Sequence, residues 1–188
     1  MGSYISRSSV RRITEGFGQR LAAHKGQEAE GASTVAKAGE SPHERRVKLQ
    51  DPIEGRGNIS SDGTMILVRG EGWKEVKAAT FSKVDILEPS SGQRRAAQRK
   101  GKRADEDMVR LSAHSYCAGL WDVDTFGPYQ YAEGLRRGID QVERLSSVND
   151  GALWIERMTL TNFPGARQIV DWSHAVERLW AVAHAVYG

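Results

Sequence analysis

Two Asp-Gly pairs, Asp62-Gly63 and Asp150-Gly151, are the residues of this chain best suited to chemistry. Each lies at the boundary of a predicted strand, where the glycine exposes the carboxylate and lets another group approach the backbone. If the two strands are neighbours, we expect the carboxylates to face each other across a narrow gap. Close carboxylates resist ionising unless a cation neutralises them, and Mg²⁺ or Mn²⁺ does so while keeping waters for substrate. The alternative is that either pair is an ordinary turn, because Asp and Gly are frequent turn residues.

A third polar motif, Asp171-Trp172-Ser173-His174, opens the last predicted helix. One interpretation is that His174 is a capping histidine, hydrogen-bonded to Asp171 across one turn. The apolar side chains of this helix are interpreted as packing residues, namely Trp172, Leu179, Trp180 and Val186. Cys117 has only His114 as a nearby base, so we do not expect a thiol nucleophile.

Composition excludes several classes of protein. The chain has 188 residues, 39% of them hydrophobic and 27% charged, which is ordinary for a globular domain with a small appendage. No apolar run approaches the roughly 20 residues that a membrane span needs, and the amino terminus has no signal-peptide pattern. A single cysteine excludes an internal disulfide framework and a cysteine-cluster zinc site. We therefore expect a cytoplasmic protein with no membrane partner.

Basic residues gather in two places, although the net charge is only +3. Such clusters attract polyanions in a salt-dependent way, and phosphate is the common candidate. The alternative is that each cluster is a solvated face or loop. The amino-terminal cluster is Arg7, Arg11, Arg12, Arg20 and Lys25, and the central one is Arg94, Arg95, Arg99, Lys100, Lys102 and Arg103.

The amino-terminal third is predicted to be a helix and a linker. Apolar residues in 6–24 recur at helical spacing, with Ser6 or Ser8 available as the N-cap. We assign residues 1–25 to a basic helical segment, a possible remnant of a helix-turn-helix, or alternatively a helix that packs on the later part of the chain. Residues 26–57 are rich in Gly, Ala, Ser, Glu and Lys and are assigned to a linker.

The remainder, 58–188, has the pattern of an α/β domain. Three strands, a helix, a strand, a helix, a strand and a final helix are predicted, which implies a mixed sheet flanked by helices. Residues 88–107 are predicted to be a loop of low hydrophobicity. In this topology the first strand lies centrally and the fourth lies beside it. The expected strands are 64–69, 73–81, 109–120, 139–148 and 167–170, and the expected helices are 124–138, 152–158 and 174–187.

Six motifs together resemble a known family. They resemble DDE-type transposases of bacterial insertion sequences, specifically the Kra-type branch related to Mutator-like elements, in order along nearly the whole chain. The motifs are Ser61-Asp62-Gly63-Thr64, Gly72-Trp73-Lys74-Glu75-Val76-Lys77, Ser115-Tyr116, Asp150-Gly151-Ala152-Leu153-Trp154-Ile155, Phe163-Pro164-Gly165-Ala166 and Ile169-Val170-Asp171-Trp172-Ser173-His174-Ala175.

The resemblance implies a ribonuclease-H-like core with Asp62 and Asp150 as the first two catalytic acids and as ligands of Mg²⁺ or Mn²⁺. Asp171 and His174 match the Asp-x-x-His signature of the helical insertion that precedes the third acid, so residues 171–188 are expected to begin that insertion. A DNA contact by His174 near the cleavage site is the alternative to the capping role. The sequence ends fourteen residues after His174, and Glu177 is too early to match the third acid, so we expect a fragment that is incomplete at its carboxyl end.

The expected function is transposase chemistry, the metal-dependent cleavage and transfer of DNA strands, impaired in this chain alone. Element ends and target DNA are the expected partners, bound through Arg7, Arg11, Arg12, Arg94, Arg95, Arg99 and Lys100, at a cytoplasmic, nucleoid-associated location. A homo-oligomer or an intact transposase is a further possible partner, and a DNA contact by Lys77 is left open. The alternatives are a non-catalytic DNA-binding remnant and an inert product of a decayed element.

Overall fold

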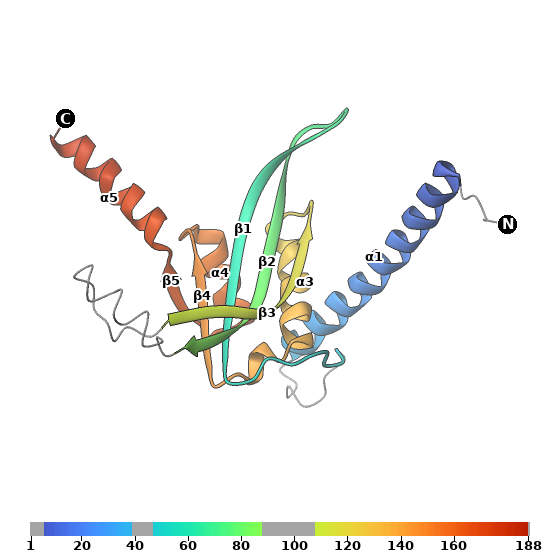
Figure 1. Ribbon diagram of the computed structural model, residues 1–188, viewed down its shortest axis with the longest axis horizontal. Coiled ribbons are helices and arrows are strands. Elements are labelled where there is room, and N and C mark those ends of the chain that lie inside the picture. The colour runs from blue at the N-terminus through green and yellow to red at the C-terminus, as the bar shows by residue number, and fades with distance from the viewer. Residues whose placement is uncertain (1–5, 39–46, 88–107, 188) are drawn as a thin grey trace.

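The computed structural model describes residues 6–38, 47–87 and 108–187. Its centre is a five-stranded mixed sheet in the order β3-β2-β1-β4-β5 (Figure 1). The strands are β1 (Arg56–Val68), β2 (Gly72–Leu87), β3 (Met108–Gly119), β4 (Arg144–Asn149) and β5 (Arg167–Val170). The helices are α1 (Arg7–Ala38), α3 (Val123–Arg136), the 3₁₀ helix η1 (Ile139–Gln141), α4 (Leu153–Asn162) and α5 (Trp172–Tyr187). The predicted order of strands and helices from the first strand onward is confirmed, and so is the central place of the first strand beside the fourth.

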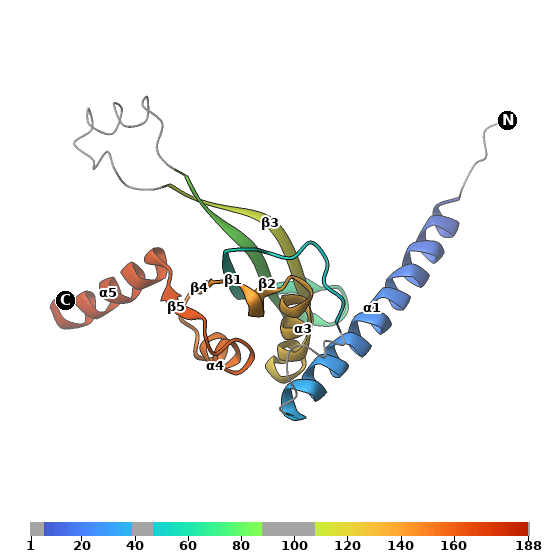
Figure 2. The ribbon, with the colours of Figure 1, turned by 90° about the horizontal axis from the view of Figure 1, so that it is seen from below.

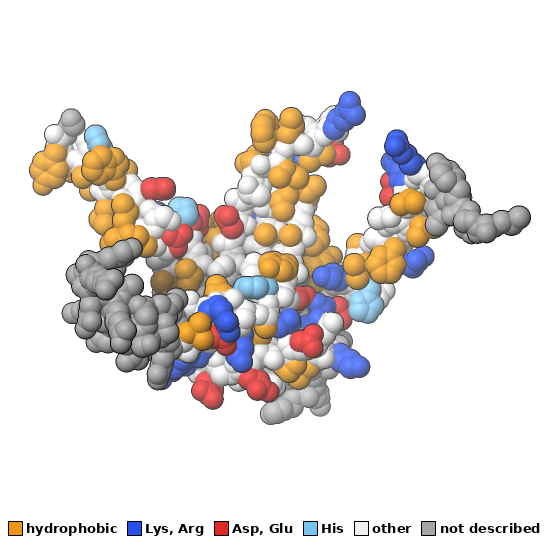
Figure 3. All heavy atoms as spheres, viewed as in Figure 1, with side chains coloured by type: hydrophobic (Ala, Val, Ile, Leu, Met, Phe, Trp, Pro, Cys, Tyr) orange, Lys and Arg blue, Asp and Glu red, His pale blue; other side chains and the backbone are white. Residues whose placement is uncertain are grey.

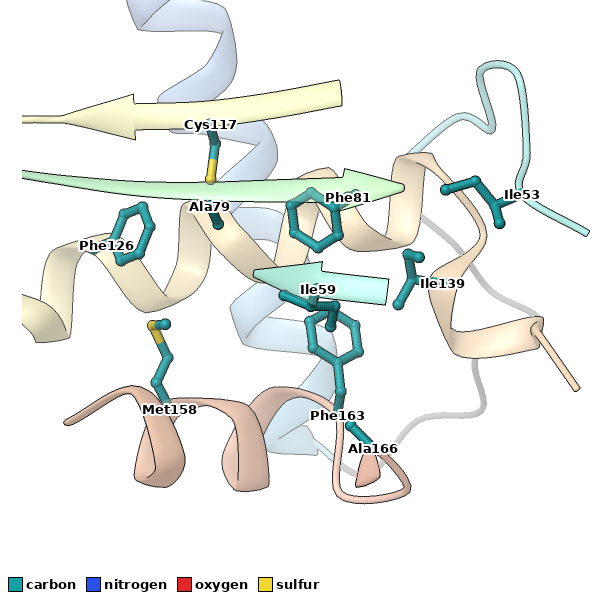
Figure 4. Packing of buried hydrophobic residues seen from close by; sticks show 10 residues of the cluster. All are labelled: Ile53, Ile59, Ala79, Phe81, Cys117, Phe126, Ile139, Met158, Phe163 and Ala166. Carbon is teal, nitrogen blue, oxygen red and sulfur yellow. The ribbon is translucent and has the colours of Figure 1, made fainter. Parts of the chain in front are cut away.

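Helices α3 and α4 cover one face of this sheet (Figure 2). They do so because Ile59 of β1 and Ala79 and Phe81 of β2 point to that face, while the helices turn aromatic and aliphatic side chains toward it. Ile59 and Phe81 from the strands meet Phe126 of α3 and Met158 of α4 in one buried cluster (Figure 4). Phe81 also lies edge-on to the ring of Phe163, with ring centroids 6.4 Å apart. This packing fixes which side chains of the strands point away from the helices.

Two kinds of pairing join the strands. β1 runs antiparallel to β2 and parallel to β4, with Ile59 opposite Ser147 as the last pair of the parallel ladder. Polar side chains hold the start of this ladder, because Ser146 Oγ donates to Asn58 Oδ1 at 2.9 Å and approaches the carbonyl of Gly57 at 3.3 Å. β4 in turn is parallel to β5. The registers therefore place defined residues of β1, β4 and β5 side by side.

The amino-terminal helix is longer than predicted. Ser6 caps it as expected, since its Oγ accepts from the backbone N–H of Ser9 at 3.1 Å, but α1 continues to Ala38. The interpretation of residues 26–38 as linker is therefore wrong. Small side chains explain the difference, because Ala29 and Ala32 are buried against α3 and allow the two helices to approach closely. The predicted loop at 88–107 lies outside the described residues.

An ion-pair network closes the contact between α1 and α3. Arg136, at the end of α3, binds the carboxylate of Glu28 on α1 and that of Glu133 one turn earlier on its own helix. All three side chains are largely buried. Because each charge has a partner there, the network stabilises the contact only as long as it is complete.

Two helices project from the body of the molecule (Figure 1). On α1 the predicted apolar stripe of Val10, Ile13, Phe17 and Leu21 is exposed rather than packed. The side chains of α5 are also largely exposed, and none of its residues is buried. The interpretation of Trp172, Leu179, Trp180 and Val186 as packing residues is therefore wrong within the described chain, since each is at least 64% exposed. Hydrophobic side chains are visible on both projecting helices in Figure 3. No helix of the described residues is long and apolar enough to cross a membrane.

Candidate functional site

Asp62 lies inside a strand and not at its end. β1 continues past Asp62 to Val68, and Asp62 pairs with Ala78 of β2. The prediction of a strand boundary at Asp62 is therefore wrong, and so is the alternative that this pair forms a turn. The side chains of Ile59 and Ser61 point toward the helices, as shown by the core position of Ile59 and the bond from Gln130 Nε2 on α3 to Ser61 Oγ at 3.1 Å. Alternation then directs Asp62, which is exposed, to the opposite face.

Asp150 follows the last residue of β4 and begins the turn into α4. Gly151 has φ +76°, a left-handed conformation that favours glycine. Asp150 Oδ1 accepts from the backbone N–H of Ala152 at 2.9 Å, which fixes the carboxylate at the turn. Here the sequence predicted both properties, because the pair is a turn and also presents a carboxylate at a strand end.

An extension of the β1–β4 register would place the two acids at the same level of neighbouring parallel strands. From the last ladder pair, Ile59 and Ser147, three further residues along each strand lead to Asp62 and Asp150. Side chains of paired residues point to the same face, so in this extended register both carboxylates would belong to the face opposite α3 and α4. Neighbouring strands are roughly 4.8 Å apart, a spacing at which two carboxylates can share a ligand. The expected pairing of Asp62 with Asp150 is compatible with this extension of the register and stays a prediction.

Asp171 extends this row onto the third parallel strand. Asn149 pairs with Val170, and the N–H of Asp171 donates to the carbonyl of Asn149 at 2.8 Å, so Asp171 lies next to Asp150. Its carboxylate is already occupied: Oδ1 accepts from Ser173 N at 2.7 Å and from Ser173 Oγ at 2.6 Å, and Oδ2 accepts from His174 Nδ1 at 2.8 Å. The capping role expected for His174 is confirmed.

The hydrogen bonds of this cap shift the pKa values of Asp171 and His174. Those from Ser173 and His174 lower the pKa of Asp171 to about 2. The bond to Asp171 raises the pKa of His174, and the charges of Glu177 and Asp150 act in the same direction. Both groups are solvent-exposed, so the shifts indicate local pairing and not burial. The imidazolium form of His174 is therefore favoured beside the row of acids.

Arg178 is a residue of this site that sequence reasoning missed. It lies one turn after His174 on α5, and its Nη2 donates to the backbone carbonyl of Asp150 at 2.8 Å. Its guanidinium also covers Gly151, where a Cβ would lie 3.1 Å from Nη1. In the sequence, only the position of Arg178 four residues after His174, on the same face of a helix, indicates that it could belong to the site. Through Arg178, α5 contacts the turn that carries the second acid.

Lys77 lies on the other face of the sheet. Its side chain is only 7% exposed, and its Nζ donates to Glu75 Oε2 at 2.6 Å and lies 5.5 Å from the ring centre of Trp154 on α4. A lysine held in this way does not extend toward a ligand on the surface. The option of a DNA contact by Lys77 is therefore not supported by its position.

The predicted DNA-binding residues are only partly described. Arg7, Arg11 and Arg12 lie on the exposed first turns of α1, and Arg11 pairs with Glu15 at 2.7 Å. Arg94, Arg95, Arg99 and Lys100 lie outside the described residues. The structure thus places Asp171 next to Asp150 and bonds it to His174, whereas Asp62 lies three residues beyond the last pair of β1 and β4. The basic first turns of α1 project away from the sheet in Figure 1.

Metal binding by a larger cluster of ligands and thiol chemistry at Cys117 can both be judged from the described part of the chain. Within it, no group of three or more His, Cys, Asp or Glu side chains is arranged to hold a metal ion. Asp171 differs from the two acids because both of its oxygens accept hydrogen bonds within its own cap. Burial raises the pKa of the Cys117 thiol to about 12, as does the charge of Glu133 to a smaller extent, which agrees with the expectation that this residue is not a nucleophile.

Comparison of the chain with models of protein families, with curated proteins and with solved structures finds no match.

Proposed function

We propose that this chain is a transposase polypeptide of the DDE type, which supplies Asp62 and Asp150 for divalent-metal-dependent cleavage and transfer of DNA strands. One observation carries the proposal. The two acids stand far apart in the sequence, yet each lies three residues beyond the last pair of the β1–β4 ladder, so an extension of that register would set them level on the face opposite α3 and α4.

The topology supports the finer part of this proposal, a ribonuclease-H-like core. Three antiparallel strands are followed by two strands parallel to the first, and each of the later connections contains a helix on the same face. Such a core leaves one face of the central strands open for acids and substrate. The resemblance of the six sequence motifs implies the same architecture.

The donor set fits a hydrated divalent ion. Asp62 accepts only the N–H of its own neighbour Gly63 among the bonds described, at 2.7 Å through Oδ1. Asp150 accepts the N–H of Ala152 through Oδ1. Each carboxylate therefore offers its second oxygen, and Mg²⁺ or Mn²⁺ takes one or two carboxylates and fills its other positions with water and phosphate oxygens.

The residues of the chain then have distinct roles. Asp62 and Asp150 would hold the metal, which when bound activates a water or a 3′-hydroxyl and stabilises the leaving oxygen of a phosphodiester. Arg178 holds the backbone of Asp150, so it fixes the direction in which that carboxylate points. His174, favoured as a cation by Asp171, adds positive charge at the edge where the phosphate would lie.

The exposed arginines of α1 support DNA as the proposed partner. Arg7 and Arg12 are exposed on α1 and have no ion-pair partner in the described part of the chain. Cations of this kind bind the phosphate backbone without sequence preference, and they do so less tightly as the salt concentration rises. The sequence that is recognised would have to be read by other contacts.

Mn²⁺ binding tests the proposal without requiring full strand transfer. Electron paramagnetic resonance of free Mn²⁺, titrated with the protein, should show binding that weakens about tenfold or more in Asp62→Asn and in Asp150→Asn, because each loses an anionic ligand. Asp124→Asn is the matched control. This carboxylate is exposed in the first turn of α3, the helix that packs on the other face of the sheet from the two acids. Metal-dependent nicking of a labelled element end should follow the same order. Unchanged Mn²⁺ binding in both site variants would refute the assignment.

A second candidate is a DNA-binding polypeptide without catalysis. The observation that favours it is the lack of a third metal-ligating side chain beside the two acids within the described residues. This candidate predicts salt-sensitive DNA binding that ignores Mg²⁺ and survives Asp62→Ala. Binding that strengthens with Mg²⁺ and depends on Asp62 would exclude it.

A further inference from the structure

The parallel ladder between β1 and β4 ends before it reaches the two acids. Its last pair is Ile59 with Ser147. In the described chain, no pair of this ladder joins the strand segment of Asp62 to the turn of Asp150. On its other edge β1 stays paired with β2, where Asp62 lies opposite Ala78. The position of Asp62 relative to Asp150 therefore depends on contacts other than the ladder.

Gln130 of α3 provides such a contact from the covered face of the sheet. Its Nε2 donates to Ser61 Oγ at 3.1 Å, and its Oε1 accepts from Asn162 Nδ2 at 2.8 Å. Asn162 is the last residue of α4, and its Nδ2 also donates to the carbonyl of Gly127 on α3 at 2.9 Å. One amide side chain thus joins β1, α3 and α4.

Both ends of this bridge belong to the segments that carry the acids. Ser61 directly precedes Asp62, and α4 begins at Leu153, directly after the turn that contains Asp150. Ser61 points to the covered face, so a bond that holds its side chain also holds the backbone from which the carboxylate of Asp62 extends to the opposite face. The bridge therefore links the β1 segment of the first acid to the helix that follows the second.

The burial of the bridge makes it restrictive. Gln130 is 0% exposed and Ser61 is 4% exposed, so water does not compete for their hydrogen bond. Buried polar groups lose free energy unless they are paired, so a displacement of β1 that broke this bond would be unfavourable. A hydrogen bond also has a preferred length and direction, whereas the apolar contacts around it are non-directional. The amide thus favours one position of β1 above the helices.

We propose that Gln130 is a positioning residue for the two acids, which holds the β1 segment of Asp62 at one distance from the turn of Asp150. The holding of this segment is a property of the fold, and its use in metal binding rests on the proposed function. Groups that orient the ligands of a metal from behind typically change metal affinity about 10–100-fold when they are removed.

A double variant, Gln130→Met with Ser61→Ala, removes the bond without leaving either partner unsatisfied. The melting temperature should stay within about 3 °C of that of the unmodified chain, because both partners are replaced by apolar groups of similar shape. Asn162 keeps its bond to Gly127. The affinity for Mn²⁺, measured by electron paramagnetic resonance on the full chain, should fall about tenfold.

A background that lacks the first acid separates positioning from a general loss of packing. In Asp62→Asn the double variant should cause no further fall in Mn²⁺ affinity, because the bridge acts through Asp62. A merely structural defect would lower the affinity in both backgrounds. Thr159→Val is the matched control, since it removes a fully buried hydroxyl of α4 that has no partner among the described residues. It should bind Mn²⁺ as the unmodified chain does.

Nuclear magnetic resonance relaxation dispersion, recorded without metal, tests the position of the segment directly. The amides of residues 60–62 should show millisecond exchange in the double variant and none in the unmodified chain. The amides of residues 57–59 should behave alike in both proteins, because these residues are paired with β4.

The outcomes separate this proposal from the proposed function. If Asp62→Asn weakens Mn²⁺ binding and the double variant does not, the positioning role is refuted and the metal site stands. If neither Asp62→Asn nor Asp150→Asn alters Mn²⁺ binding, the proposed function fails, and exchange at residues 60–62 alone decides whether Gln130 holds the segment. Unchanged amides at 60–62 in the double variant would overturn the proposal in either case.

Discussion

Replacement of Gly134 by alanine is expected to destabilise the protein, although alanine normally favours a helix over glycine. Gly134 is buried on α3, and a Cβ at this position would collide with the ring of Phe163 and lie 3.1 Å from Cε1 of Phe81. Both rings belong to the core, where neighbours leave little room for movement. Overpacking of this kind costs about 1–3 kcal/mol. The gain in helix propensity is at most about 1 kcal/mol and is smaller in the last turn. The cost of the clash therefore exceeds the gain in helix propensity, and the free energy of unfolding should fall by about 1–2 kcal/mol.

Urea unfolding followed by circular dichroism measures this difference, provided that the denaturant slope is the same for both proteins. Phe163→Leu provides the decisive second variant, since it removes the ring atoms that the new methyl group would meet. Alone it should cost about 1–2 kcal/mol through lost packing. In the double variant the methyl group occupies part of the vacated space, so the combined loss should be smaller than the sum by about 1 kcal/mol.

Gly16→Ala is the control for helix propensity without a clash, because no atom lies within 4 Å of its added Cβ. It should not destabilise the protein. A Gly134→Ala protein that is as stable as the unmodified chain, or a double variant whose loss equals the sum of the two single losses, would show that the packing at this contact has been misjudged.

Three further outcomes are expected. Arg136→Met should lower the free energy of unfolding by about 3 kcal/mol, because two buried carboxylates lose their shared cation; a loss below 1 kcal/mol in urea unfolding would argue against the network. Asp171→Asn should lower the pKa of His174, as seen in an NMR titration, since it removes the bond that raises it; an unchanged pKa would show that the cap does not form. The cap is fully charged between the ordinary pKa values of 3.8 and 6.5, so its stabilising effect should fade as pH falls toward 2 and as pH rises through the raised pKa of His174. Cys117 should resist iodoacetamide at pH 8 in the folded chain and react once urea unfolds it; rapid reaction in the folded chain would contradict its burial.

Most of the strands and helices of the α/β part could be predicted from the sequence because their patterns are local. Alternation and helical spacing located β3, α3 and β5 to within two residues at each end, and glycine marked the turn after β4. The pairing of the first and fourth strands was also predicted, since short connections and a helical crossover leave few topologies.

The errors come from interactions that are not local. Small, polar residues after Lys25 favour a loop by composition, but Ala29 and Ala32 are small for another reason, the close approach of α1 to α3. Asp62-Gly63 has the composition of a turn, yet twelve residue pairs between β1 and β2 carry the strand through it. The exposed apolar residues of α5 were assigned to a core because spacing shows that a helix has an apolar face and does not show what covers it.

The candidate site could be predicted only as far as its types of residue. The sequence indicates Asp62, Asp150 and the Asp171–His174 cap, since each is a polar group beside a predicted strand end or helix start, although Asp62 in fact lies within β1. It does not indicate Arg178, whose bond to Asp150 depends on the direction in which α5 leaves the sheet. Nor does it show that Gln130 bonds to Ser61, because their helix and strand meet only in the folded chain.

The bonds from Ser146 to Asn58 and Gly57 have a consequence for how the chain reaches its working form. A shift of β4 by a single residue along β1 would keep most backbone hydrogen bonds but would turn one of the two acids toward the core. The hydroxyl of Ser146 is matched to its partners only in the observed alignment, so it selects that alignment from its close competitors while the strands assemble. A chain with alanine at this position would be expected to fold to nearly the same stability and yet yield a larger share of molecules whose two carboxylates point to opposite faces of the sheet.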